Sequence, residues 1–150
     1  MKRVILDTNI YGRMVIDVEL DEIKEAMRRK LIVYSSEVIN LRMDLLRLYD
    51  SLVKLSISVS PEILCLAESY YFAYSKFGGR LNKSDILTDL IVVACASSKG
   101  LDIVVSEDTD TMLDNNFQKV YQLVNKLANT RNPQFLDYKE FKILLRRLPL

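Results

Sequence analysis

The chain contains no histidine among its 150 residues. This absence excludes a histidine general base, a serine or cysteine nucleophile activated by histidine, and the usual zinc ligand sets. Any catalytic chemistry in this protein must therefore depend on carboxylates, lysine, tyrosine or a bound metal ion.

Glycine, proline and cysteine are also scarce, with 4, 3 and 2 residues, while 27% of the residues are charged. This composition excludes a collagen-like, low-complexity or disordered chain, and no internal repeat is present. Cys65 and Cys95 are isolated within apolar helical patterns. We therefore predict that both are small core residues, and we expect neither a disulfide framework nor a cysteine-rich metal site.

Long apolar runs are missing as well. The first run, at residues 4–6, is too short for a signal peptide or a membrane span, so we expect a cytoplasmic protein that does not bind membranes. Lysine and arginine number 21 against 20 acidic residues. Net charge therefore gives no signal for nucleic acid, and any basic groove must come from local arrangement.

The hydrophobic content of 49% is enough to close a core around a sheet, so we predict one domain over residues 1–150. Short apolar runs predict strands at residues 4–6, 31–34, 55–59, 101–105 and 135–136. Amphipathic patterns and capping residues predict helices at residues 20–30, 37–53, 62–77, 85–98, 111–129 and 138–148. Their alternation predicts an α/β fold, a three-layer α/β/α sandwich around a mostly parallel sheet of about five strands.

Two acidic residues directly follow predicted strands. Asp7 follows the first strand, and Asp108 lies just beyond the fourth. Ligands of open parallel sheets bind beyond the carboxyl ends of the strands, so the two carboxylates converge if these strands are neighbours. An aspartate after a strand is also an ordinary turn or helix-cap residue, which makes neither position specific by itself.

Asp89 is harder to explain as a structural residue. It lies in the segment from Ile86 to Ala96, which is apolar on nearly every face of a helix, so we predict that the carboxylate is buried. Burial is costly unless the carboxylate is paired, hydrogen-bonded or bound to metal. No lysine or arginine lies within one turn, and Asp85 adds a like charge. Stabilisation by the helix N-terminus is the alternative, and it fits Asp85 better than Asp89.

Three clustered carboxylates without histidine or cysteine would form a site for Mg²⁺ or Mn²⁺. These hard cations prefer oxygen ligands and are commonly shared with substrate phosphates. Such a cation lowers the pKa of an attacking water and stabilises charge on the leaving oxygen. The acids therefore indicate phosphate-ester chemistry.

Three segments resemble the signature blocks of the PIN-domain (PilT N-terminus) nucleases. They are VILDTN at residues 4–9, DLIVVACA at residues 89–96 and IVVSED at residues 103–108. Residues 133–136 and 138–141 resemble the family's last strand and helix, so the resemblance spans essentially the whole chain. It implies a Rossmann-like sandwich with five parallel strands that cleaves RNA with Mg²⁺ or Mn²⁺.

By this resemblance Asp7, Asp89 and Asp108 match the family's metal-binding acids, while Asn9 and Ser106 match polar positions that support them. Many members are toxins of toxin–antitoxin pairs, and others process ribosomal RNA or act in RNA decay. The resemblance therefore implies an RNA substrate and an antitoxin-like protein partner, and we also expect a homodimer. It does not choose among these biological roles.

The chain departs from the family's usual pattern at the position of a fourth acid. The family usually carries a glutamate about six residues beyond the second strand, where this chain has Leu41 and Arg42. Glu37 and Asp44 bracket that place, and we predict Glu37 as the fourth catalytic acid because it has the longer reach and lies nearer the sheet edge. A first-turn glutamate is also favoured by the helix dipole alone. The alternatives are Asp44, Asp85 and Asp110.

An aromatic stretch at residues 70–77, with Lys76 and Arg80 nearby, has the composition of a surface that stacks nucleic-acid bases. We favour the interpretation as core or dimer face, because apolar residues three and four apart usually pack. Two other functions are considered: a regulatory binding module that keeps the fold without the chemistry, and a phosphoacceptor domain. The phosphoacceptor interpretation is weaker, because the chain has no paired acid after the first strand and Asp89 would have no role.

Overall fold

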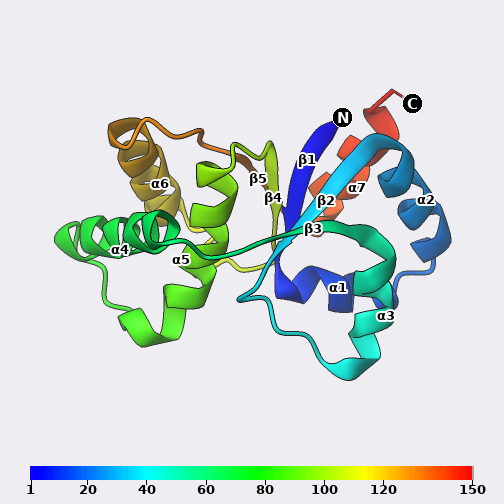
Figure 1. Ribbon diagram of the computed structural model, residues 1–150, viewed down its shortest axis with the longest axis horizontal. Helices are drawn as coiled ribbons and strands as arrows, with labels where there is room; N and C mark the ends of the chain where they lie inside the picture. The colour runs from blue at the N-terminus through cyan, green and yellow to red at the C-terminus, as the bar shows by residue number, and fades with distance from the viewer. Residues whose placement is uncertain (150) are drawn as a thin grey trace.

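The computed structural model describes residues 1–149 and contains one five-stranded, all-parallel sheet with the strand order β3-β2-β1-β4-β5 (Figure 1). The strands are β1 (Lys2–Leu6), β2 (Leu31–Ser36), β3 (Val53–Ile57), β4 (Ile103–Val105) and β5 (Gln134–Leu136). The helices within these residues are α1 (Thr8–Val15), α2 (Leu20–Lys30), α3 (Met43–Leu52), α4 (Pro61–Lys76), α5 (Lys83–Ser98), α6 (Asn115–Leu127) and α7 (Tyr138–Arg147). The predicted fold class is confirmed.

Helices cover both faces of the sheet and give the three layers (Figure 1). On one face Ile5 and Val104 pack with α4, α5 and α6, and on the other Val4 and Leu6 pack with α1, α2, α3 and α7. Successive strand residues point to opposite faces, and here both faces are buried. This double burial is why the central strands are apolar without alternation.

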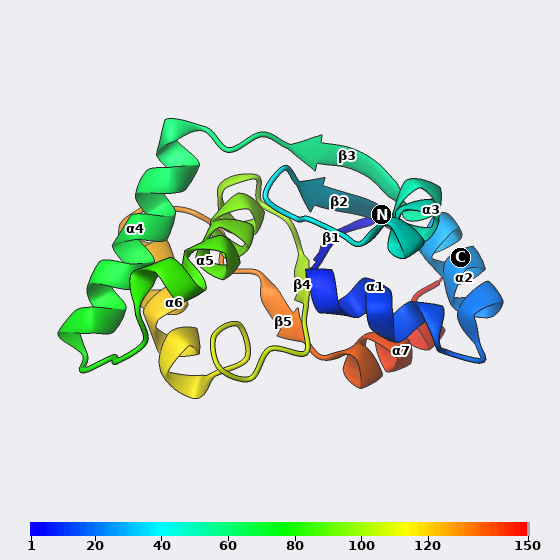
Figure 2. The ribbon, with the colours of Figure 1, turned by 90° about the horizontal axis from the view of Figure 1, so that it is seen from below.

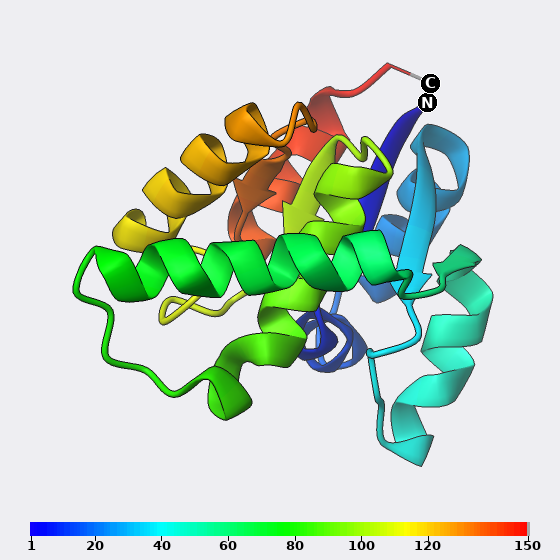
Figure 3. The same ribbon diagram turned by 60° about the vertical axis from the view of Figure 1, so that its left-hand side comes forward.

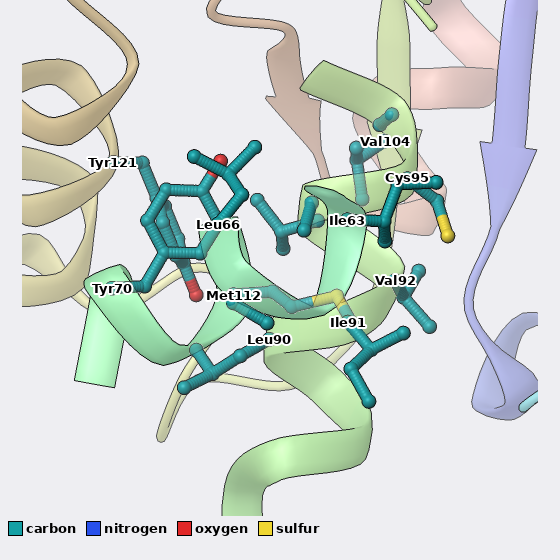
Figure 4. Close-up of a cluster of buried hydrophobic side chains, with 14 of the residues drawn as sticks. Ile63, Leu66, Tyr70, Leu90, Ile91, Val92, Cys95, Val104, Met112 and Tyr121 are labelled. Atoms are coloured by element: carbon teal, nitrogen blue, oxygen red, sulfur yellow. The ribbon is translucent and has the colours of Figure 1, made fainter. Parts of the chain in front are cut away.

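The core between α4 and α5 is shown in Figure 4. Leu66 and Tyr70 of α4, Leu90 of α5 and Met112 pack in one cluster. Leu90 and the residues around it on α5 are buried, so this helix is covered along most of its length. The predicted burial of this helix is therefore confirmed, and Asp89 is carried on it.

The strand order reverses at β1, where the chain changes the side of the sheet to which it adds strands. From β1 it adds β2 and β3 on one side, and it then returns to place β4 against the other side of β1. Leu6 pairs with Val105, so the two strands end together. This is the switch point at which ligands of doubly wound sheets bind. The residues that follow β1 and β4 are Asp7 and the segment 106–108.

Two local expectations were wrong. No helix was predicted between the first strand and residue 20, but α1 begins directly after Asp7, and its Ile10, Tyr11 and Met14 are buried. The helix expected at residues 37–53 begins only at Met43. Residues 37–42 form turns and loop instead, because the Glu37 N–H donates to the Ile57 carbonyl at 3.2 Å and the chain still follows β3.

Ser35 and Ser36 do not cap a helix, because they are the last residues of β2 and both side chains are buried. Cys95 is buried as predicted, whereas Cys65 is exposed on the outer face of α4, so that prediction was wrong. Across residues 1–149, none of the helices combines the length and the apolar character that crossing a membrane requires.

Candidate metal centre

Asp7 is held at the junction of β1 and α1. Its N–H donates to the Val105 carbonyl at 2.9 Å, so the chain is still paired with β4 at this residue. Its carboxylate is the N-cap of α1 and accepts from the Thr8 N–H at 2.8 Å. The Ser106 hydroxyl donates to its other oxygen at 2.7 Å, and the Asn9 amide donates at 3.3 Å. These hydrogen bonds fix the carboxylate of Asp7, a residue that is only 5% exposed.

Asp108 is fixed by the loop that follows β4. One carboxylate oxygen accepts from the backbone N–H groups of Asp110 at 2.8 Å and Thr111 at 3.2 Å. The other accepts from the Thr111 hydroxyl at 2.6 Å. The Asp108 N–H donates to the Ser106 hydroxyl oxygen at 2.9 Å. The Ser106 hydroxyl therefore links Asp108 to Asp7 directly.

Asp89 enters the site from the second turn of α5. The Thr111 hydroxyl lies 3.3 Å from its carboxylate and is its hydrogen-bond donor. That hydroxyl has one proton and is closer to Asp108, so it satisfies Asp89 poorly. Asp89 is half-buried and carries the weakest hydrogen bonding of the three acids.

The structure brings the three acids together, as the sequence predicted. One carboxylate oxygen from each of Asp7, Asp89 and Asp108 lies within 4.8 Å of the others (residues 1–149 contain no second cluster of this kind). Asp7 follows β1, Asp108 lies in the loop after β4, and Asp89 lies on α5. The three elements come together at the carboxyl ends of the strands (Figure 2). This arrangement is a set of oxygen ligands converging on one point.

Burial and mutual repulsion change how these acids titrate. Burial, with added repulsion from Asp7 and Asp108, raises the pKa of Asp89 to about 7. Burial also raises the pKa of Asp7, although the Ser106 and Thr8 hydrogen bonds oppose the change. Burial acts in the same direction on Asp108, but the hydrogen bonds from Thr111 and Asp110 outweigh it and lower its pKa. Asp89 is therefore the acid of the cluster that takes up a proton first as the pH falls.

No positive side chain neutralises the cluster within the described residues. None of the ion pairs there includes Asp7, Asp89 or Asp108, and Arg13 at this edge pairs with Glu107 at 3.3 Å. Uncompensated buried carboxylates are costly, and a divalent cation is the ligand that matches both their charge and their oxygen donors. The residues present therefore fit Mg²⁺ or Mn²⁺.

Asn9 joins the two loops of the site. Its side-chain amide donates to Asp7, and its carbonyl oxygen accepts from the Glu107 N–H at 3.2 Å. Ser106 has no exposed surface. Both residues thus hold the carboxylates in place, the supporting position that the resemblance implied for them.

The four candidates for a further acid lie outside the cluster. Glu37 is exposed and accepts from the Val59 N–H at 2.6 Å, which ties it to the loop after β3. The Asp44 side chain is 65% exposed and pairs with Arg42 at 3.3 Å. Asp85 and Asp110 are also exposed. The catalytic role of Glu37 stays a prediction.

The sequence did not lead us to predict a role for Thr111. This residue is 1% exposed, and its hydroxyl contacts both Asp89 and Asp108. The signal was available in the segment Asp108-Thr109-Asp110-Thr111. A threonine three residues after an aspartate commonly closes a local turn by donating its backbone and side-chain protons to the carboxylate.

Comparison with known proteins finds likeness in structure alone. No family model matches the chain, and no curated protein matches its sequence. A chain of VapBC2 from Rickettsia felis, crystallised with a DNA fragment from its promoter, matches with a TM-score of 0.60 and 10% identity, covering 91% of this chain and 98% of that one. A chain of DNA-bound VapBC from Salmonella typhimurium matches with a TM-score of 0.57, 12% identity and the same coverage. The likeness confirms the resemblance to PIN domains at the level of the fold.

Proposed function

We propose that the protein is a metal-dependent endoribonuclease that hydrolyses RNA phosphodiester bonds. In this proposal Asp7, Asp89 and Asp108 hold Mg²⁺ or Mn²⁺ at the switch point of the sheet. The observation that carries it is the cluster of three carboxylates within 4.8 Å that no cationic side chain of the described residues compensates. The PIN-like fold supports the choice of RNA as substrate.

The three acids would contribute to the site in two ways. The hydrogen bonds to Asp7 and Asp108 hold one oxygen of each in a fixed direction, so little reorganisation is needed when a ligand binds. Asp89 has few hydrogen bonds and a pKa of about 7, and a bound cation would favour its ionised form. A bound divalent cation supplies stabilisation of phosphoryl charge and a lower pKa for the attacking water.

The direct test is incubation of the purified protein with end-labelled RNA, with Mn²⁺ or Mg²⁺ and with EDTA. We expect cleavage that requires the cation. Equal cleavage in EDTA would remove the metal mechanism.

A second candidate function is supported by one observation: the described structure places no fourth acid in the cluster. A protein with this fold and a weaker site would bind RNA or a protein without cutting. Binding of RNA without cleavage under any of the metal conditions would favour this regulatory module.

Partners are also part of the proposal. The similar solved structures are VapBC complexes, which supports an antitoxin-like protein partner for this chain. Ile16 and Val18, 73% and 100% exposed, line one pocket with Ile143 and provide an apolar surface for such a contact. We also propose a homodimer that acts on RNA in the cytoplasm. Light scattering of the purified protein tests the dimer.

A further inference from the structure

A cavity of about 730 Å³ lies between the loop that follows α4 and the start of α6, and the metal-site proposal leaves it without a role. We call it the Phe77 pocket. The residues of its wall that matter here are Phe77, Arg80, Asp110, Asn116 and Lys119. Figure 3 shows the loop after α4 in green and the yellow loop that leads into α6.

The Phe77 pocket adjoins the carboxylate cluster. Asp110 forms part of its wall, and the Asp110 N–H donates to the Asp108 carboxylate at 2.8 Å. The loop that carries one proposed metal ligand therefore also forms one side of the pocket. A chain whose phosphate lies at the carboxylates would place a neighbouring nucleotide within reach of this wall.

The pocket is built in advance of any ligand. The Tyr74 hydroxyl accepts from the backbone N–H groups of Arg80 and Leu81, each at 3.1 Å, and the Tyr71 hydroxyl donates to the Leu81 carbonyl at 3.0 Å. Gly78 has a φ of 86°, and a Cβ on Gly79 would overlap the Tyr74 ring. The two glycines let the loop lie against this ring, which fixes the position of Phe77 and Arg80.

The pocket offers the groups that bind a nucleotide. Phe77 is 70% exposed, whereas Tyr70 and Tyr74 on the preceding helix are buried. Phe72 on that helix is also exposed, at 64%, but it lies outside the pocket. Arg80 and Lys119 are exposed, and neither takes part in an ion pair with another described residue. An open aromatic ring stacks a base, and two free cations contact phosphate.

We propose that the Phe77 pocket binds a nucleotide of single-stranded RNA that neighbours the phosphate held at the carboxylate cluster. The base stacks on Phe77, its polar edge faces Asp110 and Asn116, and Arg80 and Lys119 contact the phosphate backbone. This inference rests on the proposed function, because that function defines the substrate. The aromatic stretch at residues 70–77 is thus divided between core and ligand surface.

The test compares variants of the pocket with matched controls on the same helices. Phe77→Ala and the double variant Arg80→Ala/Lys119→Ala remove the proposed contacts. Phe72→Ala and Lys126→Ala are the controls, because both side chains are exposed and lie outside the pocket. Melting temperatures confirm that each variant is folded. Binding of a labelled single-stranded RNA 12-mer is measured in EDTA, and its cleavage is measured in Mn²⁺.

We expect Phe77→Ala to weaken RNA binding and raise KM at least about fivefold, with kcat within about twofold of the parent. The double variant should also reduce the slope of log affinity against log salt by about one, because it removes phosphate contacts. The controls should match the parent. If Phe77→Ala binds RNA like Phe72→Ala, the pocket assignment is wrong.

The two proposals fail in different ways. Cleavage by the parent with unchanged KM in both pocket variants keeps the nuclease and overturns the pocket. RNA binding that depends on Phe77, without cleavage in any metal, keeps the pocket and overturns the nuclease. A parent that neither binds nor cuts the RNA overturns both.

Discussion

Replacing Asp89 by asparagine tests whether this acid is present for metal binding or for the fold. Asparagine has nearly the same shape and carries no charge, so it removes the repulsion from Asp7 and Asp108 without opening a cavity. A ligand carboxylate that is strained without its cation should give a more stable protein when it is neutralised. A helix-capping or ion-paired carboxylate should give a less stable one.

The magnitude follows from the pKa of Asp89, which rises from 3.8 to about 7 on folding. An acid with a raised folded pKa costs stability above its unfolded pKa, and the cost grows from pH 3.8 until it levels off above pH 7. At about 1.36 kcal/mol per pKa unit the full cost is about 4 kcal/mol, and partial exposure of the side chain reduces it to about 2–4 kcal/mol. In EDTA at pH 7.5 we therefore expect Asp89→Asn to melt about 5–10 °C above the parent.

The assay is a set of melting curves in EDTA and in Mn²⁺, at pH 4.5 and pH 7.5. At pH 4.5 the gain in EDTA should fall to about a quarter, because Asp89 of the folded parent is already protonated while the unfolded chain is still mostly ionised. Added Mn²⁺ should raise the melting temperature of the parent at pH 7.5 and raise that of Asp89→Asn much less. Asp85→Asn is the control, because Asp85 is exposed four residues earlier on the same helix. A lower melting temperature for Asp89→Asn in EDTA at pH 7.5 would refute the reasoning.

Three further variants test the surrounding structure. Thr111→Val removes the hydroxyl that contacts two clustered carboxylates, so we expect Mn²⁺ affinity in titration calorimetry to fall about tenfold; unchanged affinity would show that the hydroxyl is dispensable. Glu37→Gln should weaken Mn²⁺ binding and RNA cleavage while Asp44→Asn does not, and if neither variant changes either property the prediction for Glu37 is wrong. Hydrogen bonding by Lys142, at 2.8 Å, is the main reason that the pKa of Asp17 falls to about 2. Asp17→Asn should therefore lower the free energy of unfolding by about 1 kcal/mol at pH 7, and by progressively less as the pH falls from 4 toward 2. Urea denaturation at pH 7 and near pH 2 would check this.

The sheet and the three acids could be predicted because their signals are local. Apolar runs without alternation indicate strands buried on both faces, and such strands belong to a parallel sheet covered by helices. Once strands one and four are placed in that sheet, the acids that follow them must lie at the same edge if the strands are neighbours. Asp89 could be predicted because a carboxylate on a helix that is apolar all round is buried at a cost that a bound cation offsets.

The segment after β2 could not be predicted because its conformation depends on a distant strand. Ser35, Ser36 and Glu37 have the composition of a helix start, with two capping hydroxyls followed by an acid. Pairing with β3 overrides this preference, and the Glu37 N–H bonds to the Ile57 carbonyl instead of starting a helix. Local helix propensity is overridden where a distant strand offers the backbone better hydrogen bonds.

The start of α1 was missed for a related reason. The segment Asp7-Thr8-Asn9 is rich in turn-forming residues, and the same short polar side chains serve as helix caps. Asp7 is such a cap, since its carboxylate accepts from the Thr8 N–H. An aspartate can cap a helix and join a metal cluster at the same time, and the sequence alone does not show that Asp7 does both.

The most direct measurement of the central claim is the rate of RNA cleavage as a function of Mn²⁺ concentration, for the parent and for Asp108→Asn, with Mn²⁺ binding titrated on the same samples. We expect the parent to reach half its maximal rate near the Mn²⁺ concentration that half-fills its site. Asp108→Asn should lose both binding and cleavage, and EDTA should abolish the activity of the parent. Cleavage that persists in EDTA, or that Asp108→Asn retains in full, would contradict the account.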